Sequence, residues 1–146
     1  FVKISPDIHD DELGVMCSTF LEFNVDGIII SNTTLERPFK GFGTNLRGGL
    51  SGRLLYQTST DQLKKVYEKT KGQIPLIGVG GISSAKDAYN KIRNGASLVQ
   101  LYTGLVYQGP GLIKKINQEI SVLLKNDGFD NIQDAVGIDA EIVNDN

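Results

Sequence analysis

Two short stretches of this sequence combine an apolar run with the glycine and hydroxyl residues that bind phosphate groups. The run at residues 74–79 ends in the glycine pair 80–81, and a helix start follows at once. A strand, a glycine turn and a helix N-terminus in this order present backbone N–H groups and the positive end of a helix dipole to an anion. A second apolar run, residues 97–101, follows one helix later and ends in the polar segment 102–104. Two neighbouring strand ends of this kind predict one shared phosphate site.

The glycine pattern also has two other interpretations. Gly78-x-Gly80-Gly81 is similar to a dinucleotide-binding fingerprint, but Ser83 stands where the third glycine belongs, and the following strand lacks the acidic residue at its end. A tight turn without any ligand is the second alternative. The similar polar end of the next strand favours the phosphate site over both.

A second polar cluster, residues 31–34, directly follows the apolar run 27–30. In a parallel sheet this is the ligand-binding end of the strand. One amide and three hydroxyls there can recognise a small polar ligand through donors and acceptors, although a polar turn with an Asx cap has the same composition. Lys3 lies within another apolar run. A lysine there either lies on an exposed edge or faces something anionic.

The composition excludes several classes of function. The chain has 146 residues, is 40% hydrophobic and 22% charged, and carries a net charge of −2, which gives no reason to expect nucleic acid or an anionic membrane as a partner. Cys17 is the only cysteine, so no internal disulfide is possible, and its place on an apolar helix stripe predicts a buried thiol. His9 is the only histidine, and no His/Cys cluster has metal-ligand spacing. No apolar run is long enough to cross a bilayer, and no signal peptide is visible.

The order of elements predicts the fold class. Four apolar runs (1–5, 27–31, 74–79 and 97–101) alternate with helical patterns, and the last of these opens at Pro110. Ser59 or Thr60 is the expected cap of the second helix, and Ser84 that of the third. Strict alternation predicts an α/β fold with a parallel sheet, as in the C-terminal half of a (β/α)8 TIM barrel. A doubly wound open sheet is the alternative.

Three segments lie outside this regular pattern. The chain starts inside a predicted strand without an initiator methionine, so we expect it to be part of a longer chain whose N-terminal half is absent here. Residues 32–52 form a long glycine-rich stretch without helical or strand period, which is typical of a functional loop. Residues 141–146 are acidic, and we expect a frayed tail there.

Several motifs occurring in order resemble class 2, quinone-dependent dihydroorotate dehydrogenase, an FMN enzyme of pyrimidine (UMP) biosynthesis. The resemblance runs from Phe1 to about Gly137. Its motifs are Val2-Lys3-Ile4-Ser5-Pro6-Asp7, Ser31-Asn32-Thr33-Thr34, Gly48-Gly49-Leu50-Ser51-Gly52, Gly78-Val79-Gly80-Gly81-Ile82 and Gly95-Ala96-Ser97-Leu98-Val99-Gln100-Leu101-Tyr102-Thr103. The endings Gly128-Phe129-Asp130-Asn131 and Asp134-Ala135-Val136-Gly137 also match the family pattern.

The resemblance implies a role for each matching residue. The FMN-binding set is Lys3, Ser31, Ser51, Gly52, Gly80, Gly81, Tyr102 and Thr103, in which Lys3 offsets the charge of the reduced flavin and the last four hold the phosphate. Asn32 and Thr33 would bind dihydroorotate or orotate. Tyr102, Leu105 and Pro110 would lie near a quinone tunnel. Residues 1–146 would then be part of a single FMN-binding barrel domain without a metal.

The family pattern also implies parts that this sequence lacks. The serine base that takes the substrate proton belongs to the first half of the barrel, so no catalytic base is assigned here, and Cys17 does not match the cysteine base of class 1 enzymes. The helices that dock on a membrane and receive ubiquinone belong to the same absent part. The implied location is peripheral on the mitochondrial inner membrane in a eukaryote, or the cytoplasmic membrane in a bacterium. Another phosphate-binding or FMN-dependent barrel enzyme and an inactive barrel fragment are the alternatives.

Overall fold

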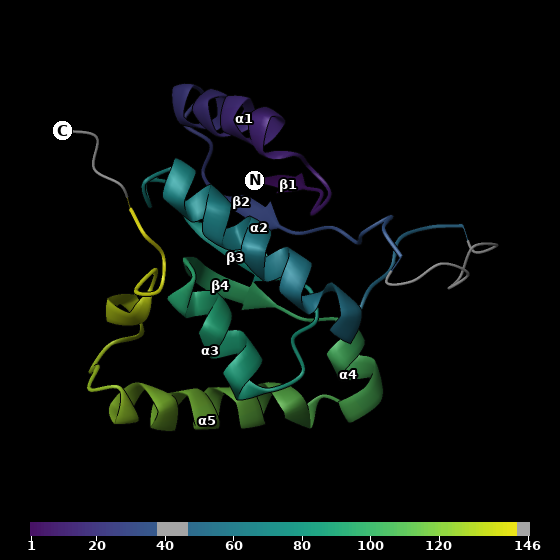
Figure 1. Ribbon diagram of the computed structural model, residues 1–146. Helices are drawn as coiled ribbons and strands as arrows, with labels where there is room; N and C mark the ends of the chain where they lie inside the picture. The colour runs from purple at the N-terminus through teal and green to yellow at the C-terminus, as the bar shows by residue number, and fades with distance from the viewer. Residues whose placement is uncertain (38–46, 143–146) are drawn as a thin grey trace.

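A computed structural model describes residues 1–37 and 47–142 of the chain (Figure 1). Its centre is a four-stranded parallel sheet in the order β1-β2-β3-β4. The strands are β1 (Val2–Ile4), β2 (Ile28–Ile30), β3 (Leu76–Val79) and β4 (Ala96–Gln100). Each strand is followed by a helical segment, and sequential strands are neighbours. This confirms the predicted half of a (β/α)8 barrel and excludes the doubly wound order.

The register of the sheet explains the apolar runs. Lys3 pairs with Ile29, Ile29 with Ile77, and Ile77 with Leu98. Side chains alternate between the faces of a strand. Ile4, Ile28, Ile30 and Leu76, which flank this row, all belong to one buried cluster under the helices. The row from Lys3 to Leu98 therefore lies on the opposite face, which is the inner face of a barrel.

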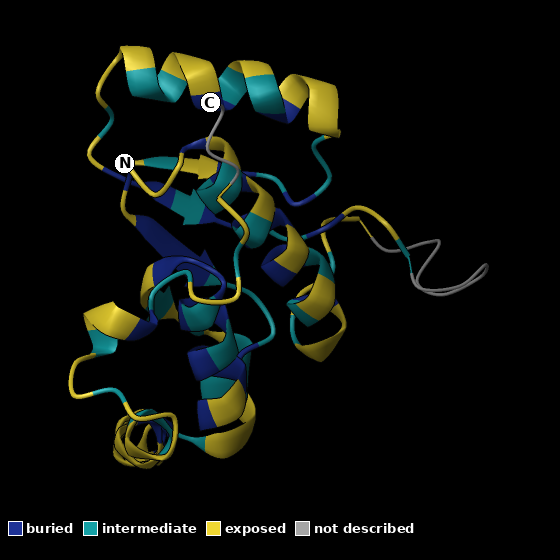
Figure 2. Cartoon of the chain, turned by 60° about the vertical axis from the view of Figure 1, so that its left-hand side comes forward, coloured by how far each residue is buried: buried dark blue, intermediate teal, exposed yellow. Residues whose placement is uncertain are grey.

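Helices α1 (Asp10–Glu22) and α2 (Tyr56–Lys69) cover the outer face of β1 to β3. Leu13 and Cys17 of α1 are fully buried against this sheet, which confirms the buried thiol predicted for Cys17. Asp10 and the two acidic residues after it occupy the first turn of α1, where the helix dipole favours negative charge. Figure 2 shows that the exposed residues of these helices lie on their outer faces, while the strands between them include both buried and exposed residues.

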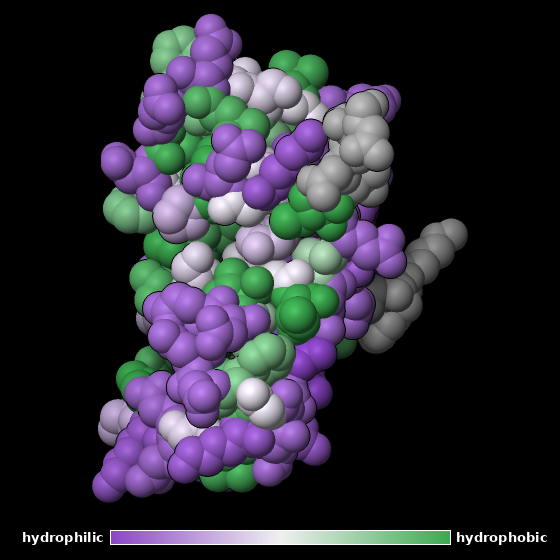
Figure 3. All heavy atoms as spheres, turned by 90° about the vertical axis from the view of Figure 1, so that its left-hand side faces the viewer, coloured by the Kyte–Doolittle hydropathy of each residue, from purple (hydrophilic) through white to green (hydrophobic). Residues whose placement is uncertain are grey.

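A second cluster joins α3 (Ala85–Arg93) to α5 (Gly111–Asn126), which packs outside it. Ala88 and Ile92 of α3, four residues apart, are buried on one face of the helix. Pro110 precedes the first residue of α5, also as predicted. On the face shown in Figure 3, hydrophilic residues cover most of the lower part, where α5 lies.

Two predicted helix caps have different outcomes. The Ser84 hydroxyl accepts a hydrogen bond from the Asp87 N–H at 3.2 Å, which confirms the cap of α3. The prediction that Ser59 or Thr60 caps α2 is wrong. The short helix η1 (Arg53–Leu55) runs directly into α2, so α2 starts before Ser59. The Ser59 and Thr60 hydroxyls therefore lie inside α2, where both accept hydrogen bonds from the buried Lys91.

Besides η1, two other short helices lack a counterpart in the sequence analysis. They are α4 (Thr103–Gln108), directly after β4, and η2 (Ile132–Ala135), near the end of the described chain. Asp7, three residues before α1, holds the segment after β2, because its carboxylate accepts hydrogen bonds from the Thr34 hydroxyl and the Leu35 N–H. The predicted loop 32–52 is closed by an antiparallel bridge between Thr34 and Leu50. Residues 38–46 of that loop and 143–146 of the predicted tail lie outside the described residues.

Candidate functional site

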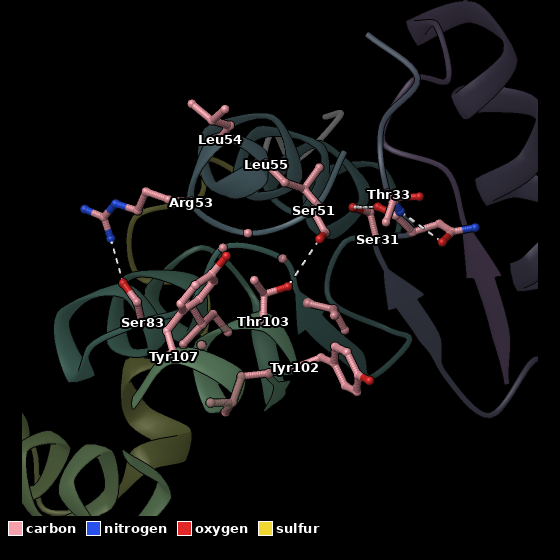
Figure 4. Close-up of a pocket in the computed structure, with 18 of the residues that line it drawn as sticks. Ser31, Thr33, Ser51, Arg53, Leu54, Leu55, Ser83, Tyr102, Thr103 and Tyr107 are labelled. Atoms are coloured by element: carbon pink, nitrogen blue, oxygen red, sulfur yellow. Dashed lines mark hydrogen bonds between the residues drawn. The ribbon is translucent and has the colours of Figure 1, made fainter. Parts of the chain in front are cut away.

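A cavity of about 590 Å³ lies at the carboxyl ends of the four strands. Its lining includes all ten residues predicted to bind cofactor or substrate: Lys3, Ser31, Asn32, Thr33, Ser51, Gly52, Gly80, Gly81, Tyr102 and Thr103. They come from four strand ends and from the end of the loop before η1 (Figure 4). Parallel strands bring their carboxyl ends to one edge, and this is why residues up to 100 positions apart meet here.

The turn between β3 and α3 forms one wall of the cavity. Gly80 has φ of 115° and Gly81 φ of 71°, a region that favours glycine. A Cβ at Gly81 would run into the backbone and Cβ of Tyr56, and one at Gly80 would lie 2.8 Å from the Ser59 Oγ. Close packing of α2 behind the turn therefore requires both glycines, independently of any ligand.

The backbone donors of this wall suit an anion. None of the hydrogen bonds among the described residues uses the N–H groups of Gly81, Ile82, Thr103 or Gly104. The two segments adjoin, because a Cβ at Gly104 would lie 2.6 Å from the Ile82 carbonyl oxygen. Unused N–H groups from two adjacent strand ends fit the phosphate of a cofactor.

The segment before η1 closes another side of the cavity. The Thr103 hydroxyl lies 3.2 Å from the Ser51 hydroxyl, and Figure 4 shows this hydrogen bond. Gly52, with φ of 77°, follows Ser51, and a Cβ there would lie 3.2 Å from the Thr103 methyl group. Ser51 and Gly52 are thus held against the end of β4, next to the predicted phosphate site.

The polar residues after β2 form the opposite side. Ser31 is 2% exposed, and its hydroxyl donates to the Asn32 carbonyl at 2.8 Å. Asn32 is exposed, and its Oδ1 accepts from the Thr33 N–H at 2.9 Å. Among the described residues no hydrogen bond uses the Asn32 amide NH₂, so it is free to donate to a ligand. Because Oδ1 accepts from the very next residue, this contact is not the Asx cap that the sequence allowed, and Asn32 lines the cavity.

Lys3 lies on the inner face of β1 and lines the same cavity. Its side chain is exposed, and within the described ranges no carboxylate lies in ion-pair distance of it. The edge-strand interpretation holds, because β1 is the outer strand of this sheet, and an anion facing Lys3 stays a prediction. An unpaired ammonium at the cavity provides positive charge for an electron-rich ligand.

Sequence reasoning missed a charged cluster at the cavity rim. Arg53 Nη1 lies 2.8 Å from the Asp87 carboxylate and 3.1 Å from the Ser83 hydroxyl. The same carboxylate accepts from the Ser83 N–H at 3.0 Å. Burial raises the pKa of Asp87, but the hydrogen bonds from Ser83 and Ser84 and the charge of Arg53 outweigh it and leave the pKa below its ordinary value. Asp87 therefore stays ionised and ties η1 to the β3–α3 turn. In the sequence, the only indication of this cluster is that Arg53 directly follows Gly52, which was predicted to bind the cofactor.

The end of β4 and helix α4 contribute two tyrosines. Tyr102 and Tyr107 line the cavity although they are 81% and 85% exposed (Figure 4). Leu105 and Pro110, predicted with Tyr102 near a quinone tunnel, are not part of the cavity lining. Leu105 packs instead against the cluster between α3 and α5.

The family model for dihydroorotate dehydrogenase matches residues 1–124. The chain belongs to the dihydroorotate dehydrogenase family. It is 50% identical over 143 residues to a dihydroorotate dehydrogenase (quinone) of Parvibaculum lavamentivorans, which covers 97% of this chain and 41% of the relative. It is 49% identical to the mitochondrial dihydroorotate dehydrogenase (quinone) of Oryza sativa subsp. japonica, with 94% of this chain and 30% of the relative covered.

A solved member of the dihydroorotate dehydrogenase family has the same fold. The crystal structure of DHODH from Eimeria tenella in complex with ferulenol superposes with a TM-score of 0.90 at 41% identity, covering 95% of this chain and 38% of that protein. The chain thus spans less than half the length of these relatives. Within the described residues no helix is long and apolar enough to span a membrane, and no cluster of potential metal ligands is found.

Proposed function

We propose that this chain supplies the FMN site and part of the orotate site of a quinone-dependent dihydroorotate dehydrogenase. One observation carries the proposal: the ten residues that the family resemblance assigns to cofactor and substrate all line one cavity at the strand ends. The proposed unit is a single barrel domain to which residues 1–146 contribute. Family membership and the names of relatives from bacteria and plants support the same activity.

In this proposal the residues of the chain bind and orient, and FMN, when bound, supplies the capacity to take two electrons from dihydroorotate. The N–H groups around Gly81 and Thr103 hold the phosphate. Lys3 offsets negative charge that develops on the reduced cofactor. The free amide NH₂ of Asn32 donates to the substrate, and Thr33 adds a hydroxyl. The base that removes the substrate proton is a serine outside this chain.

The proposed electron acceptor is ubiquinone, reached near Tyr102, the one residue of the predicted tunnel that lines the cavity. Leu105 and Pro110 would contact quinone only on a path outside this cavity. The proposed location is peripheral, on the mitochondrial inner membrane of a eukaryote or the cytoplasmic membrane of a bacterium. Membrane contact would come from the part of the enzyme that precedes this chain.

The test uses a chimera in which this chain replaces the matching segment of the Parvibaculum lavamentivorans relative. We expect the purified chimera to carry FMN, to bind orotate with a shift of the flavin absorbance, and to reduce quinone with dihydroorotate. A chimera that folds but carries no flavin would contradict the FMN site. One that carries FMN without responding to orotate would favour the alternative, another flavin-dependent barrel enzyme.

A further inference from the structure

Lys91 is a cation without exposed surface, in the last turn of α3. Its alkyl chain crosses Gly78 of β3, where an added Cβ would lie 3.2 Å from the Lys91 Cδ. Its ammonium reaches α2, where Nζ lies 2.8 Å from the Ser59 hydroxyl and 2.9 Å from the Thr60 hydroxyl. Residues of α2 and β3 therefore surround the Lys91 side chain, which comes from α3.

No carboxylate within the described residues forms an ion pair with Lys91. Asp87 on the same helix is paired with Arg53, and Asp61 on α2 is exposed and accepts from Gln57. Both carboxylates act on Lys91 only from a distance, and burial outweighs them, so that the pKa of Lys91 falls to about 7.

The remaining neighbour of the ammonium is aromatic. The Tyr56 ring lies 5.2 Å from the Lys91 Nζ, and the Arg53 guanidinium lies 5.6 Å from the same ring. A buried charge without a counterion lowers stability, and methionine would fill similar space without that cost. Such a loss of folding stability is understandable if the buried charge acts on a bound ligand.

One hydroxyl separates Lys91 from the cavity wall. The Ser59 hydroxyl accepts a hydrogen bond from Lys91. Its own proton is shared between two carbonyl oxygens, that of Tyr56 at 3.0 Å and that of Gly80 at 3.3 Å. Gly80 lines the cavity, and Tyr56 packs directly behind Gly81. The carbonyl of Gly80 is therefore held on the α2 side of the turn, behind the cavity wall.

We propose that Lys91 is a positioning residue and buried positive charge for the anion subsite at the Gly80–Gly81 turn. Its ammonium attracts the phosphate of the bound cofactor through the turn, and its contact with Ser59 fixes the Gly80 carbonyl away from that phosphate. The inference rests on the proposed function, in which this turn holds the FMN phosphate. An anion bound there favours protonated Lys91, so binding takes up a proton when Lys91 is partly neutral beforehand.

The experiment measures binding of FMN and of riboflavin, which lacks the phosphate, to the flavin-free chimera between pH 6.5 and pH 9. We expect FMN to bind more tightly than riboflavin, with a ratio of affinities that falls as the pH rises above about 7. Calorimetry at pH 8 in two buffers of different ionisation enthalpy should show proton uptake with FMN and none with riboflavin. The phosphate itself, with a second pKa of about 6, is already a dianion at that pH.

Lys91→Met should weaken FMN binding at pH 6.5 by about tenfold, abolish the proton uptake and leave riboflavin affinity unchanged. Lys86→Met is the matched control, because it removes an exposed charge from the same helix, and it should retain the proton uptake. Ser59→Ala breaks the link to the Gly80 carbonyl but keeps the charge. It should lower the FMN preference while the pH dependence persists.

The outcomes separate this inference from the function on which it rests. Equal affinities for FMN and riboflavin in the unmodified chimera would contradict the phosphate site itself. A clear FMN preference without proton uptake at pH 8 would overturn the role of Lys91, and this measurement does not depend on any variant folding. An FMN preference and proton uptake that persist in Lys91→Met would overturn it as well.

Discussion

Replacing Lys91 by methionine should make the flavin-free protein more stable at neutral pH while it weakens cofactor binding. In the folded protein burial lowers the pKa of Lys91 from 10.5 to about 7. At 1.36 kcal/mol per pKa unit, this difference corresponds to about 5 kcal/mol against the folded state at pH 7 and below. Methionine removes that cost but gives up two hydrogen bonds to Ser59 and Thr60, each contributing about 1 kcal/mol. A net stabilisation of about 3 kcal/mol follows.

The pH dependence has a definite sign. Between about pH 7 and 10.5 the unfolded chain binds more protons at this lysine than the folded chain, so the unmodified protein becomes more stable as the pH rises. The advantage of Lys91→Met is therefore largest at or below pH 7 and shrinks towards pH 9. Burial raises the pKa of Cys17, which works against folding in the upper part of this range in both proteins. Because Cys17 is present in both proteins, its contribution cancels when the two unfolding free energies are subtracted.

The assay is urea unfolding of the flavin-free chimera and its Lys91→Met variant at pH 6.5, 7.5 and 8.5, followed by far-ultraviolet circular dichroism. Lys86→Met serves again as the exposed control, with a change within about 0.5 kcal/mol. A Lys91→Met variant that is less stable at pH 6.5 and has the same pH slope as the unmodified protein would refute the reasoning. In that case the lysine would be a stabilising hydrogen-bond donor rather than a destabilising charge.

Three further predictions concern the cavity and the end of the chain. Asn32→Ala should weaken orotate binding by about 1–3 kcal/mol, measured by titration of the flavin absorbance, because a ligand acceptor loses its donor. Gly81→Val should leave the chimera without flavin and lower its melting temperature, because a side chain there collides with α2, whereas Gly109→Ala, with nothing within 4 Å of its Cβ, should keep normal flavin content. Arg93→Gln should cost about 1 kcal/mol in urea unfolding and leave flavin content unchanged, because it removes 2.6 Å ion pairs with Asp127 and Asp139, and none of these residues lines the cavity.

The strands and long helices were predictable because local pattern and tertiary burial agree in them. Three consecutive isoleucines form β2, and Leu13 and Cys17, four residues apart, form the buried face of α1. The cavity residues were predictable for a topological reason, since parallel strands bring their carboxyl ends together. The family resemblance added the roles of those residues, which composition and spacing alone do not provide.

The features that were missed depend on contacts between distant residues. Helix α4 has six residues and no buried side chain, so it leaves no apolar period in the sequence. Arg53 reaches the cavity rim through Asp87, 34 positions away. Lys91 is a lysine in the polar last turn of a helix, for which burial is rare. Only the structure shows Gly78 on one side of it and two hydroxyls on the other.

The uncovered face of the sheet supports a last prediction, for the chain expressed alone. Leu98 lies on the inner face and is 64% exposed, and within the described residues neither β1 nor β4 has a strand on its outer side. Open strand edges and an apolar face favour association. We expect residues 1–146 alone to form dimers or aggregates in light-scattering chromatography and to show no quinone reduction with dihydroorotate and added FMN. Leu98→Lys should lower the associated fraction, because it places a charge on the exposed inner face. A monomer that oxidises dihydroorotate would show that the open face needs no partner and that the base lies within this chain.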